Sequence, residues 1–202
     1  MKKKRTKFTL AKVAFRDSPI EGRGVFALRR FEPGDVITPY APKQHRVDVW
    51  SEEARLAAQT KLTLLSDDRQ VIIPDTSVPG GWLCNHSCRP NASIFSSGEG
   101  RIECLRTIVP QQEVTIFYGW VTRNQPARDP CRCGAANCRG FVNFDITDEE
   151  ARNAEADTPE GERFRQKLAD YFEFLRQIGQ EQAKGNVMHT LSKMREQLLQ
   201  GE

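Results

Sequence analysis

The sequence has no run of eighteen apolar residues, so no part of it is long and apolar enough to cross a membrane as a helix. It shows no internal repeat and no low-complexity segment, and its 202 residues fit one compact domain with an appendage. No uninterrupted apolar stretch follows the basic segment at residues 2–7, because Lys12, Arg16 and Asp17 lie where a signal peptide would be apolar. We therefore expect no secretory signal, and we expect a reducing compartment in which clustered cysteines bind metal rather than form disulfides.

Six cysteines are present, and three of them lie in the arrangement Cys-x-Cys-x4-Cys between residues 131 and 138. Four thiolates complete a tetrahedral structural zinc site. This spacing differs from the paired CxxC of a zinc ribbon, so the fourth ligand has to come from a distant segment. Cys88 is the candidate, whereas Cys84 and Cys104 have apolar neighbours and are expected to fill space in the core. Such a site would join residues 131–138 to the polar segment around Cys88.

The net charge of +3 conceals an uneven distribution. Residues 1–144 carry 22 basic and 14 acidic side chains, a balance of +8, whereas residues 145–202 carry 8 and 13, a balance of −5. The basic leader, residues 1–10, is typical of a nuclear import signal or a nucleic-acid contact, but a frayed, solvated terminus is the more frequent case. No stretch interleaves aromatic residues with Lys and Arg, so the sequence does not favour a nucleic-acid reader.

Short strands and turns dominate the chain up to about residue 118. The expected strands are residues 8–15, 25–28, 36–37, 71–73, 102–105 and 113–118. A helix is expected at about residues 47–65, where apolar residues recur at spacings of three or four. These residues are Val47, Trp50, Ala54, Ala58, Leu62 and Leu65. Many short strands with little helix argue for a β-rich fold rather than an alternating α/β one.

The chain changes character in its last third. Thr147 and Glu150 have the spacing of a helix capping box, and Thr158, followed by proline, offers a second helix start. Apolar residues then recur at spacings of three and four, which predicts two amphipathic helices interrupted by glycines. These residues are Phe164, Leu168, Tyr171, Leu175, Ile178, Val187, Leu191, Met194 and Leu198. Such a stripe most often packs on its own domain, and dimerisation or partner binding is the alternative.

Four motifs occur in the order in which they stand in a known family. They are Gly-Arg-Gly-Val-Phe-Ala at residues 22–27, Asn-His-Ser-Cys-Arg-Pro-Asn at 85–91, Glu-Val-Thr-Ile-Phe-Tyr-Gly at 113–119, and Cys-x-Cys-x4-Cys-Arg-Gly ending at 140. The second and fourth are the most specific, and together the motifs span about residues 11–144. The sequence resembles a SET-domain protein lysine methyltransferase followed by its post-SET zinc segment.

The resemblance implies a β-rich α+β fold, the SET-domain fold of several short sheets with a pseudoknot, a post-SET zinc loop and C-terminal helices. The implied order is a basic leader (1–10), a SET domain (11–125), a post-SET zinc segment (126–144) and a C-terminal helical extension (145–202). It also places residues 85–91 beside residues 113–119. The implied cofactors are S-adenosylmethionine and one structural Zn²⁺ per chain. The implied zinc ligands are Cys88, Cys131, Cys133 and Cys138.

By resemblance, Tyr118 corresponds to the family's active-site tyrosine, whose hydroxyl lies beside the transferring methyl group and the lysine nitrogen. Tyr40 matches a second tyrosine that lines the same pocket, although the residues after it depart from the family pattern. The implied cofactor-binding residues are Arg23, Gly24, Asn85, His86, Tyr40 and Phe141. Gly22 and Gly24 have no Cβ, which lets backbone groups approach a bulky ligand closely. Phe141 has a second interpretation, a hydrophobic plug under the tail helices.

Two further positions depart from the family pattern without excluding activity. Phe117 stands where Asp or Asn is common. Ile116 stands where Phe or Tyr is common, and an aliphatic side chain there favours addition of more than one methyl group unless it is plain strand core. The expected partner is a histone or another basic protein, which would put the chain in the nucleus or the cytoplasm. The alternative is a catalytically silent, zinc-stabilised SET-like module that binds a peptide or nucleic acid.

Overall fold

The computed structural model of the chain describes residues 12–48, 51–58, 64–65, 70–95, 100–118, 120–123, 129–142 and 144–177. The chain divides into two compact units. The first comprises residues 1–117 with 132–134, and the second comprises residues 118–131 with 135–202. The basic leader and the second of the two predicted tail helices lie outside the described residues. Among the described residues, no helix has the length and apolar character that crossing a membrane requires.

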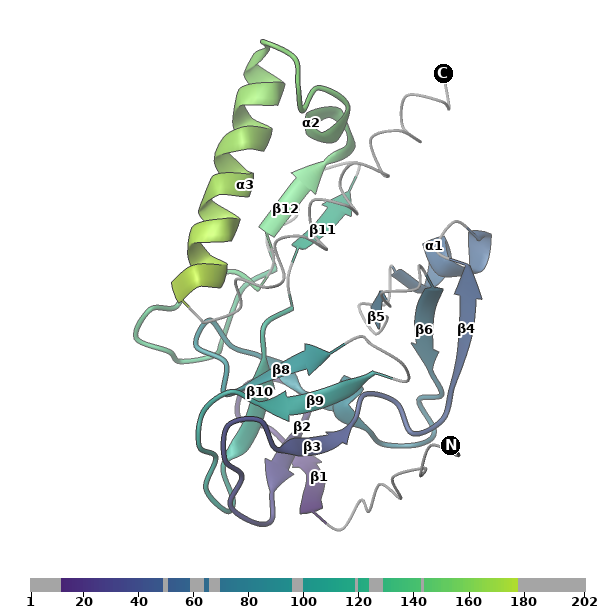
Figure 1. Cartoon of the computed structure of the whole chain (residues 1–202), viewed down its shortest axis with the longest axis vertical. Helices are drawn as coiled ribbons and strands as arrows, with labels where there is room; N and C mark the ends of the chain where they lie inside the picture. Colours follow the sequence, from purple (N-terminus) through teal and green to yellow (C-terminus); the bar gives the residue numbers. More distant parts are fainter. Residues whose placement is uncertain are drawn as a thin grey trace, which may run out of the picture. The chain divides into compact units, whose positions relative to one another are not determined.

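The described residues of the first unit form three small sheets (Figure 1). One sheet has the order β1 (Val13–Asp17), β2 (Arg23–Ala27), β10 (Glu113–Ile116) and β7 (Asn85–His86). A second has the order β3 (Val36–Pro39), β9 (Arg101–Cys104) and β8 (Ala92–Phe95). A third has the order β4 (Gln44–Asp48), β6 (Gln70–Pro74) and β5 (Leu64–Leu65). The expected β-rich fold of several short sheets is confirmed.

Apolar side chains from these sheets form one core. Its members include Val25, Ala27, Ile37, Ile72, Ala92, Ile102, Val114 and Ile116. Phe31 and Ile108 are also completely buried, and they form an isolated antiparallel bridge between two connecting segments. β-branched residues predominate because they pack well on a pleated surface. Cys84 and Cys104 lie in the same core, at 1% and 3% exposure, as the sequence predicted.

The helix expected at about residues 47–65 is shorter than predicted. Helix α1 spans Glu52–Ala58, and Val47 and Leu65 lie in strands β4 and β5, both paired with Val71 of β6. Strand pairing thus overrides the helical spacing of these two residues, because pairing with a distant strand is invisible to local periodicity. The side chain of Ser51 accepts a hydrogen bond from the backbone of Ala54 at 3.1 Å and so marks the start of the helix.

The second unit contains a pair of parallel strands and two helices. Strands β11 (Trp120–Arg123) and β12 (Phe144–Thr147) pair in parallel, and α2 (Asp148–Arg152), α3 (Pro159–Gln177) follow. Figure 1 shows α3 running alongside β12, with α2 at the far end of that strand. Helix α3 buries Phe164, Tyr171, Phe174 and Leu175. The described part of the predicted stripe therefore packs on its own chain.

Both predicted helix starts are confirmed. The Thr147 hydroxyl accepts a hydrogen bond from the Glu150 backbone at 3.1 Å, and the Glu150 carboxylate accepts one from the Thr147 backbone at 2.9 Å. These reciprocal bonds are the capping box that the sequence predicted. At α3 the Thr158 hydroxyl accepts a hydrogen bond from the backbone of Gly161 at 3.2 Å, with proline as the first helical residue.

Glu150 also joins the two helices, because its buried carboxylate accepts a hydrogen bond from Lys167 at 2.8 Å. Burial raises the pKa of Glu150, but the bonds from Lys167 and Thr147 outweigh burial and leave the pKa below its ordinary value. The carboxylate therefore stabilises the fold fully above its unfolded-state pKa. This stabilisation is lost as the pH falls through the lower folded-state pKa.

We expect Glu150→Gln to lower the free energy of unfolding by about 1–2 kcal/mol at pH 7, because it removes a charged acceptor. Urea denaturation measures this loss, which should shrink as the pH falls through the lowered pKa of the folded-state carboxylate. Glu149→Gln makes the same change at the preceding, exposed residue and should cost less than about 0.5 kcal/mol. Equal losses of unfolding free energy in the two variants would contradict the stabilising role assigned to the Glu150 carboxylate.

Candidate active site and metal centre

Strands β7 and β10 bring two of the sequence motifs together. They pair in parallel, with Asn85 opposite Thr115 and His86 opposite Ile116. Asn91 reinforces this pairing, because its amide donates to the Glu113 carbonyl at 2.8 Å and accepts from the Thr115 backbone at 2.8 Å. Residues 85–91 and 113–118 are therefore neighbours in space, as the sequence predicted.

Asn85 lies at the centre of a polar network that holds the turn before β2. Its side-chain amide donates to the carbonyls of Glu21 at 3.0 Å and Arg23 at 3.2 Å, and to the Glu113 carboxylate at 2.9 Å. The Ser18 hydroxyl donates to the same carboxylate at 2.8 Å. These bonds shape the backbone of residues 18–23.

Glu113 and Ser18 are site-building residues that the sequence alone did not reveal. The available signal was the position of Glu113, a carboxylate at the first residue of a buried strand inside one of the four motifs. A carboxylate in such a place needs hydrogen-bond donors. Its donors, Ser18 and Asn85, lie 95 and 28 residues away in the sequence, so local patterns do not show them.

The two glycines of the first motif have different surroundings. Gly22 has a positive φ of 49°, and nothing lies within 4 Å of where a Cβ would stand, so the turn has open space on that side. Gly24 is buried, and a Cβ there would collide with the Glu113 carboxylate and lie 3.2 Å from the Ser18 Cβ. The missing side chain of Gly24 thus makes room for Glu113, while the side of Gly22 on which a Cβ would stand is open.

We expect Gly24→Ala to lower the free energy of unfolding by about 1–3 kcal/mol, because the new methyl group displaces the Glu113 carboxylate from its hydrogen bonds. In a Glu113→Ala background the same change should cost less than about 0.5 kcal/mol, since the collision is gone. Chemical denaturation of the four proteins in this double-mutant cycle measures the coupling. An equal cost in both backgrounds would show that another group opposes the methyl.

Strand β10 ends beside the predicted catalytic tyrosine. Ile116 and Phe117 are buried at 3% and 9% exposure, whereas the next residue, Tyr118, is 37% exposed. Tyr118 is therefore not the ordinary core tyrosine that an isolated strand residue would suggest. Tyr40, in contrast, is 4% exposed and belongs to the hydrophobic core.

His86 and Arg23 occupy contrasting positions. The His86 ring is buried at 3% exposure, lies 5.4 Å from the Phe117 ring and places Nε2 3.4 Å from the Cys88 sulfur. Arg23 begins strand β2 in an exposed position and donates to the Phe15 carbonyl at 3.2 Å. His86 thus connects the end of β10 to the cysteine cluster, and Arg23 lies on the surface of the turn that Asn85 holds.

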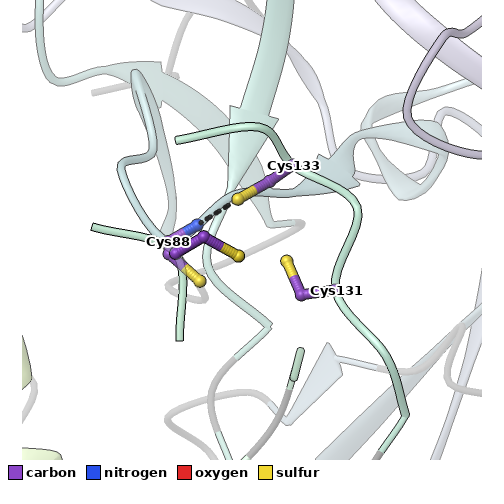
Figure 2. Close-up of side chains that lie close together, drawn as sticks. Cys88, Cys131 and Cys133 are labelled. Carbon is purple, nitrogen blue, oxygen red and sulfur yellow. Dashed lines mark hydrogen bonds between the residues drawn. The ribbon is translucent and has the colours of Figure 1, made fainter. Parts of the chain in front are cut away.

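Four cysteine sulfurs gather at one place. The sulfurs of Cys88, Cys131, Cys133 and Cys138 all lie within 4.8 Å of one another. Figure 2 labels Cys88, Cys131 and Cys133 and marks the bond from the Cys88 backbone N–H to the Cys133 sulfur, which is 3.4 Å long. Sulfurs held around a zinc ion at about 2.3 Å lie about 3.8 Å apart in a tetrahedron, so the set fits a structural zinc site.

Backbone hydrogen bonds close the loop that carries three of these cysteines. Val142 donates to Asp129 and Cys131 donates to Gly140, both at 3.0 Å, and Cys138 donates to Ala135 at 2.9 Å within a tight turn. Gly140 has a φ of 83°, a left-handed conformation that favours glycine, and its backbone donates to the Cys138 sulfur at 3.4 Å. The loop is therefore shaped around its sulfur atoms.

The other two cysteines are separate from the cluster. Burial raises the pKa of the Cys84 thiol far above its ordinary value, and the nearby Glu113 carboxylate raises it further. Burial also raises the pKa of Cys104, whose thiol donates to the Arg106 carbonyl at 2.9 Å. Both remain protonated thiols, which are poor metal ligands.

Phe141 is half-buried beside the last cysteine of the loop. The Arg139 guanidinium lies 4.5 Å from the centroid of its ring and 5.1 Å from that of Phe174 in helix α3. This arrangement supports the second interpretation of Phe141, as an apolar residue packed beneath the tail helices.

Residues 22–119 match the family model of the SET domain. The chain is 33% identical over 142 residues to the H3 lysine-4 specific histone-lysine N-methyltransferase of Cryptococcus neoformans, covering 64% of this chain and 10% of that protein. It is 32% identical to histone-lysine N-methyltransferase TRX1 of Oryza sativa, covering 77% and 16%. With histone-lysine N-methyltransferase 2B of Homo sapiens the identity is 28%, covering 62% and 5%.

The chain thus spans between 5% and 16% of the length of these curated relatives. Among solved structures, a Plasmodium falciparum putative histone methyltransferase matches 52% of this chain and 90% of that chain, with 19% identity and a TM-score of 0.39. The family match covers three of the four sequence motifs, and the four-cysteine cluster contains the fourth. The chain is therefore a SET-domain protein related to histone-lysine methyltransferases.

Proposed function

We propose that this chain transfers methyl groups from S-adenosylmethionine to a lysine side chain of a protein substrate. The parallel pairing of β7 with β10 carries this proposal, because it sets Asn85 and His86 beside the strand from which the exposed Tyr118 emerges. The names of the relatives, histone-lysine N-methyltransferases, support it. An exposed tyrosine next to a buried polar strand has no role in the core, and it suits a reaction at the protein surface.

The turn at residues 18–23 suits the cofactor. The backbone beside Gly22 borders open space, and the Asn85 amide bonds to Glu21 and Arg23 hold that turn in a fixed shape. We assign cofactor contacts to this turn and to the backbone of Asn85 and His86. Bound S-adenosylmethionine would supply a methyl group carried on a sulfonium sulfur. When the amine takes this methyl group, the remainder of the cofactor is the leaving group, a neutral thioether.

Tyr118 is the residue to which we assign the positioning of the lysine amine. Its hydroxyl can accept a hydrogen bond from the amine and direct the nitrogen lone pair towards the methyl group. Placing the reactants in line provides much of the rate in such a displacement, which requires no protein nucleophile. Ile116, which precedes this site by two residues, is completely apolar, and we infer that it leaves room for more than one methyl group.

We assign the cysteine cluster to one structural Zn²⁺ per chain. All four ligands are sulfurs, which leaves no open coordination position for catalysis. The bond from the Cys88 backbone to the Cys133 sulfur satisfies one thiolate from the first unit itself. Zinc would order the loop at residues 129–142, since loop and metal fold together.

We propose a histone, the substrate class in the names of the relatives, as the first substrate to test, with a nuclear location. The balance of +8 in residues 1–144 gives no electrostatic preference for a basic tail, so another basic protein is the second candidate. A catalytically silent binding module remains the alternative function.

Calorimetry with S-adenosylmethionine separates an enzyme from a silent module, because the enzyme should give a saturable isotherm. Transfer of radiolabelled methyl groups to core histones, compared with a whole-cell protein extract, then identifies the substrate class. Label on a lysine of either sample supports the proposal, and absence of cofactor binding overturns it. Cofactor binding with label in the extract but not in histones would correct the substrate alone.

A further inference from the structure

Arg139, the residue that follows the last cysteine of the loop, contacts two aromatic rings. Its guanidinium carbon lies 4.5 Å from the centroid of Phe141 in the same loop and 5.1 Å from the centroid of Phe174 in helix α3. A guanidinium within about 6 Å of a ring centroid is attracted by the negative face of the ring, more strongly when water is excluded. Arg139 therefore joins the cysteine loop to the C-terminal helix.

The helix presents a buried surface at this contact. Phe174 is 5% exposed, and its neighbours Tyr171 and Leu175 are 6% and 1% exposed. Burial raises the pKa of Tyr171, while the positive charge of Arg139 acts in the opposite direction. The guanidinium thus meets a dry, aromatic face of α3, where such a contact is strongest.

The backbone around Arg139 transmits this contact to the cysteines. Before Arg139, the Cys138 backbone N–H donates to the Ala135 carbonyl within a tight turn. After Arg139, the Gly140 backbone N–H donates to the Cys138 sulfur, and the Gly140 carbonyl accepts from the Cys131 backbone N–H. A restraint at Arg139 therefore limits the movement of the segment that presents the Cys138 sulfur.

We propose that Arg139 is a positioning residue through which helix α3 holds Cys138 in the geometry for zinc, so that retention of the metal depends on the C-terminal helix. This inference rests on the zinc site of the proposed function. It gives α3 a role in metal binding, because loss or displacement of α3 would leave the Cys138 sulfur without this restraint.

The rate of zinc transfer from the full chain to an excess of a chromogenic chelator tests this inference. Phe174→Leu keeps apolar bulk in the helix but removes the ring, and Phe164→Leu makes the same change at a residue of similar burial ten positions earlier. Ten residues place Phe164 about 15 Å away along the helix. Far-ultraviolet circular dichroism of both variants checks that α3 remains folded.

We expect Phe174→Leu and Arg139→Gln each to release zinc about tenfold faster than the wild type, and Phe164→Leu to stay within about twofold. The double variant Phe174→Leu/Arg139→Gln should release zinc no faster than Arg139→Gln. The reason is that both changes remove the same contact, between the Arg139 guanidinium and the Phe174 ring. Equal release from Phe174→Leu and Phe164→Leu, or additive effects in the double variant, would overturn the inference. A wild type that holds no zinc would overturn the zinc site itself.

Discussion

Replacing Cys88 by serine is expected to weaken zinc binding roughly a hundredfold or more, because one of four thiolates is lost from a closed site. Cys88 is completely buried, so a replacement ligand cannot readily reach its position. Freshly purified, reduced wild-type protein should contain about one zinc per chain by elemental analysis. The variant should contain less than about a tenth of that amount after dialysis against a chelator.

Cys104→Ser is the matched control for this prediction. Cys104 is buried to a similar extent, at 3% exposure, but it belongs to the core, and a serine hydroxyl can keep the bond to the Arg106 carbonyl. We expect this variant to retain its zinc. A wild type with less than about a tenth of a zinc per chain, or equal zinc loss from both variants, would contradict the ligand assignment.

The cysteine cluster was predictable because the chemistry of the ligands constrains the fold. Three closely spaced thiols require a fourth, and Cys88 differs from Cys84 and Cys104 in standing within a polar motif rather than among apolar residues. The proximity of residues 85–91 to residues 113–119 was an expectation from the family resemblance. Neither strand alone indicates its partner, since β7 contains two residues.

The interactions that support the site were not predictable from local patterns. Glu113 meets Ser18 across 95 residues, and the reason for the missing side chain at Gly24 becomes visible only when these two are side by side. The predicted ends of helix α1 were wrong for the same reason, because Val47 pairs with Val71 and so belongs to a strand. Long-range pairing decides such cases, and periodicity in a short window does not contain it.

The tail shows where local rules suffice. The Thr147–Glu150 capping box and the Thr158 cap both form as the sequence indicates, because each needs residues only three positions apart. The contact of Arg139 with Phe174 joins residues 35 positions apart, and no local pattern contains it. Helix starts are therefore readable from the sequence, whereas the partner of the helix face is not.

Tyr118→Phe is expected to slow methyl transfer by about 10²-fold or more, close to 2.7 kcal/mol in activation free energy. The change keeps the ring and removes one hydroxyl, whose role in positioning the amine is exerted as transfer proceeds. Cofactor affinity measured by calorimetry should therefore change by less than about threefold, and the loss should appear in single-turnover transfer at saturating cofactor.

His86→Ala supplies the contrast for Tyr118. His86 is buried between Phe117 and the Cys88 sulfur, so its loss should disturb the motif at residues 85–91 and weaken cofactor binding together with turnover. Tyr118 stands at 37% exposure, where removal of a hydroxyl leaves the core unchanged, and the unfolding midpoint of Tyr118→Phe should match that of the wild type. A Tyr118→Phe protein that transfers methyl groups at the full rate would make Tyr118 a packing residue and would remove the central step of the proposed mechanism.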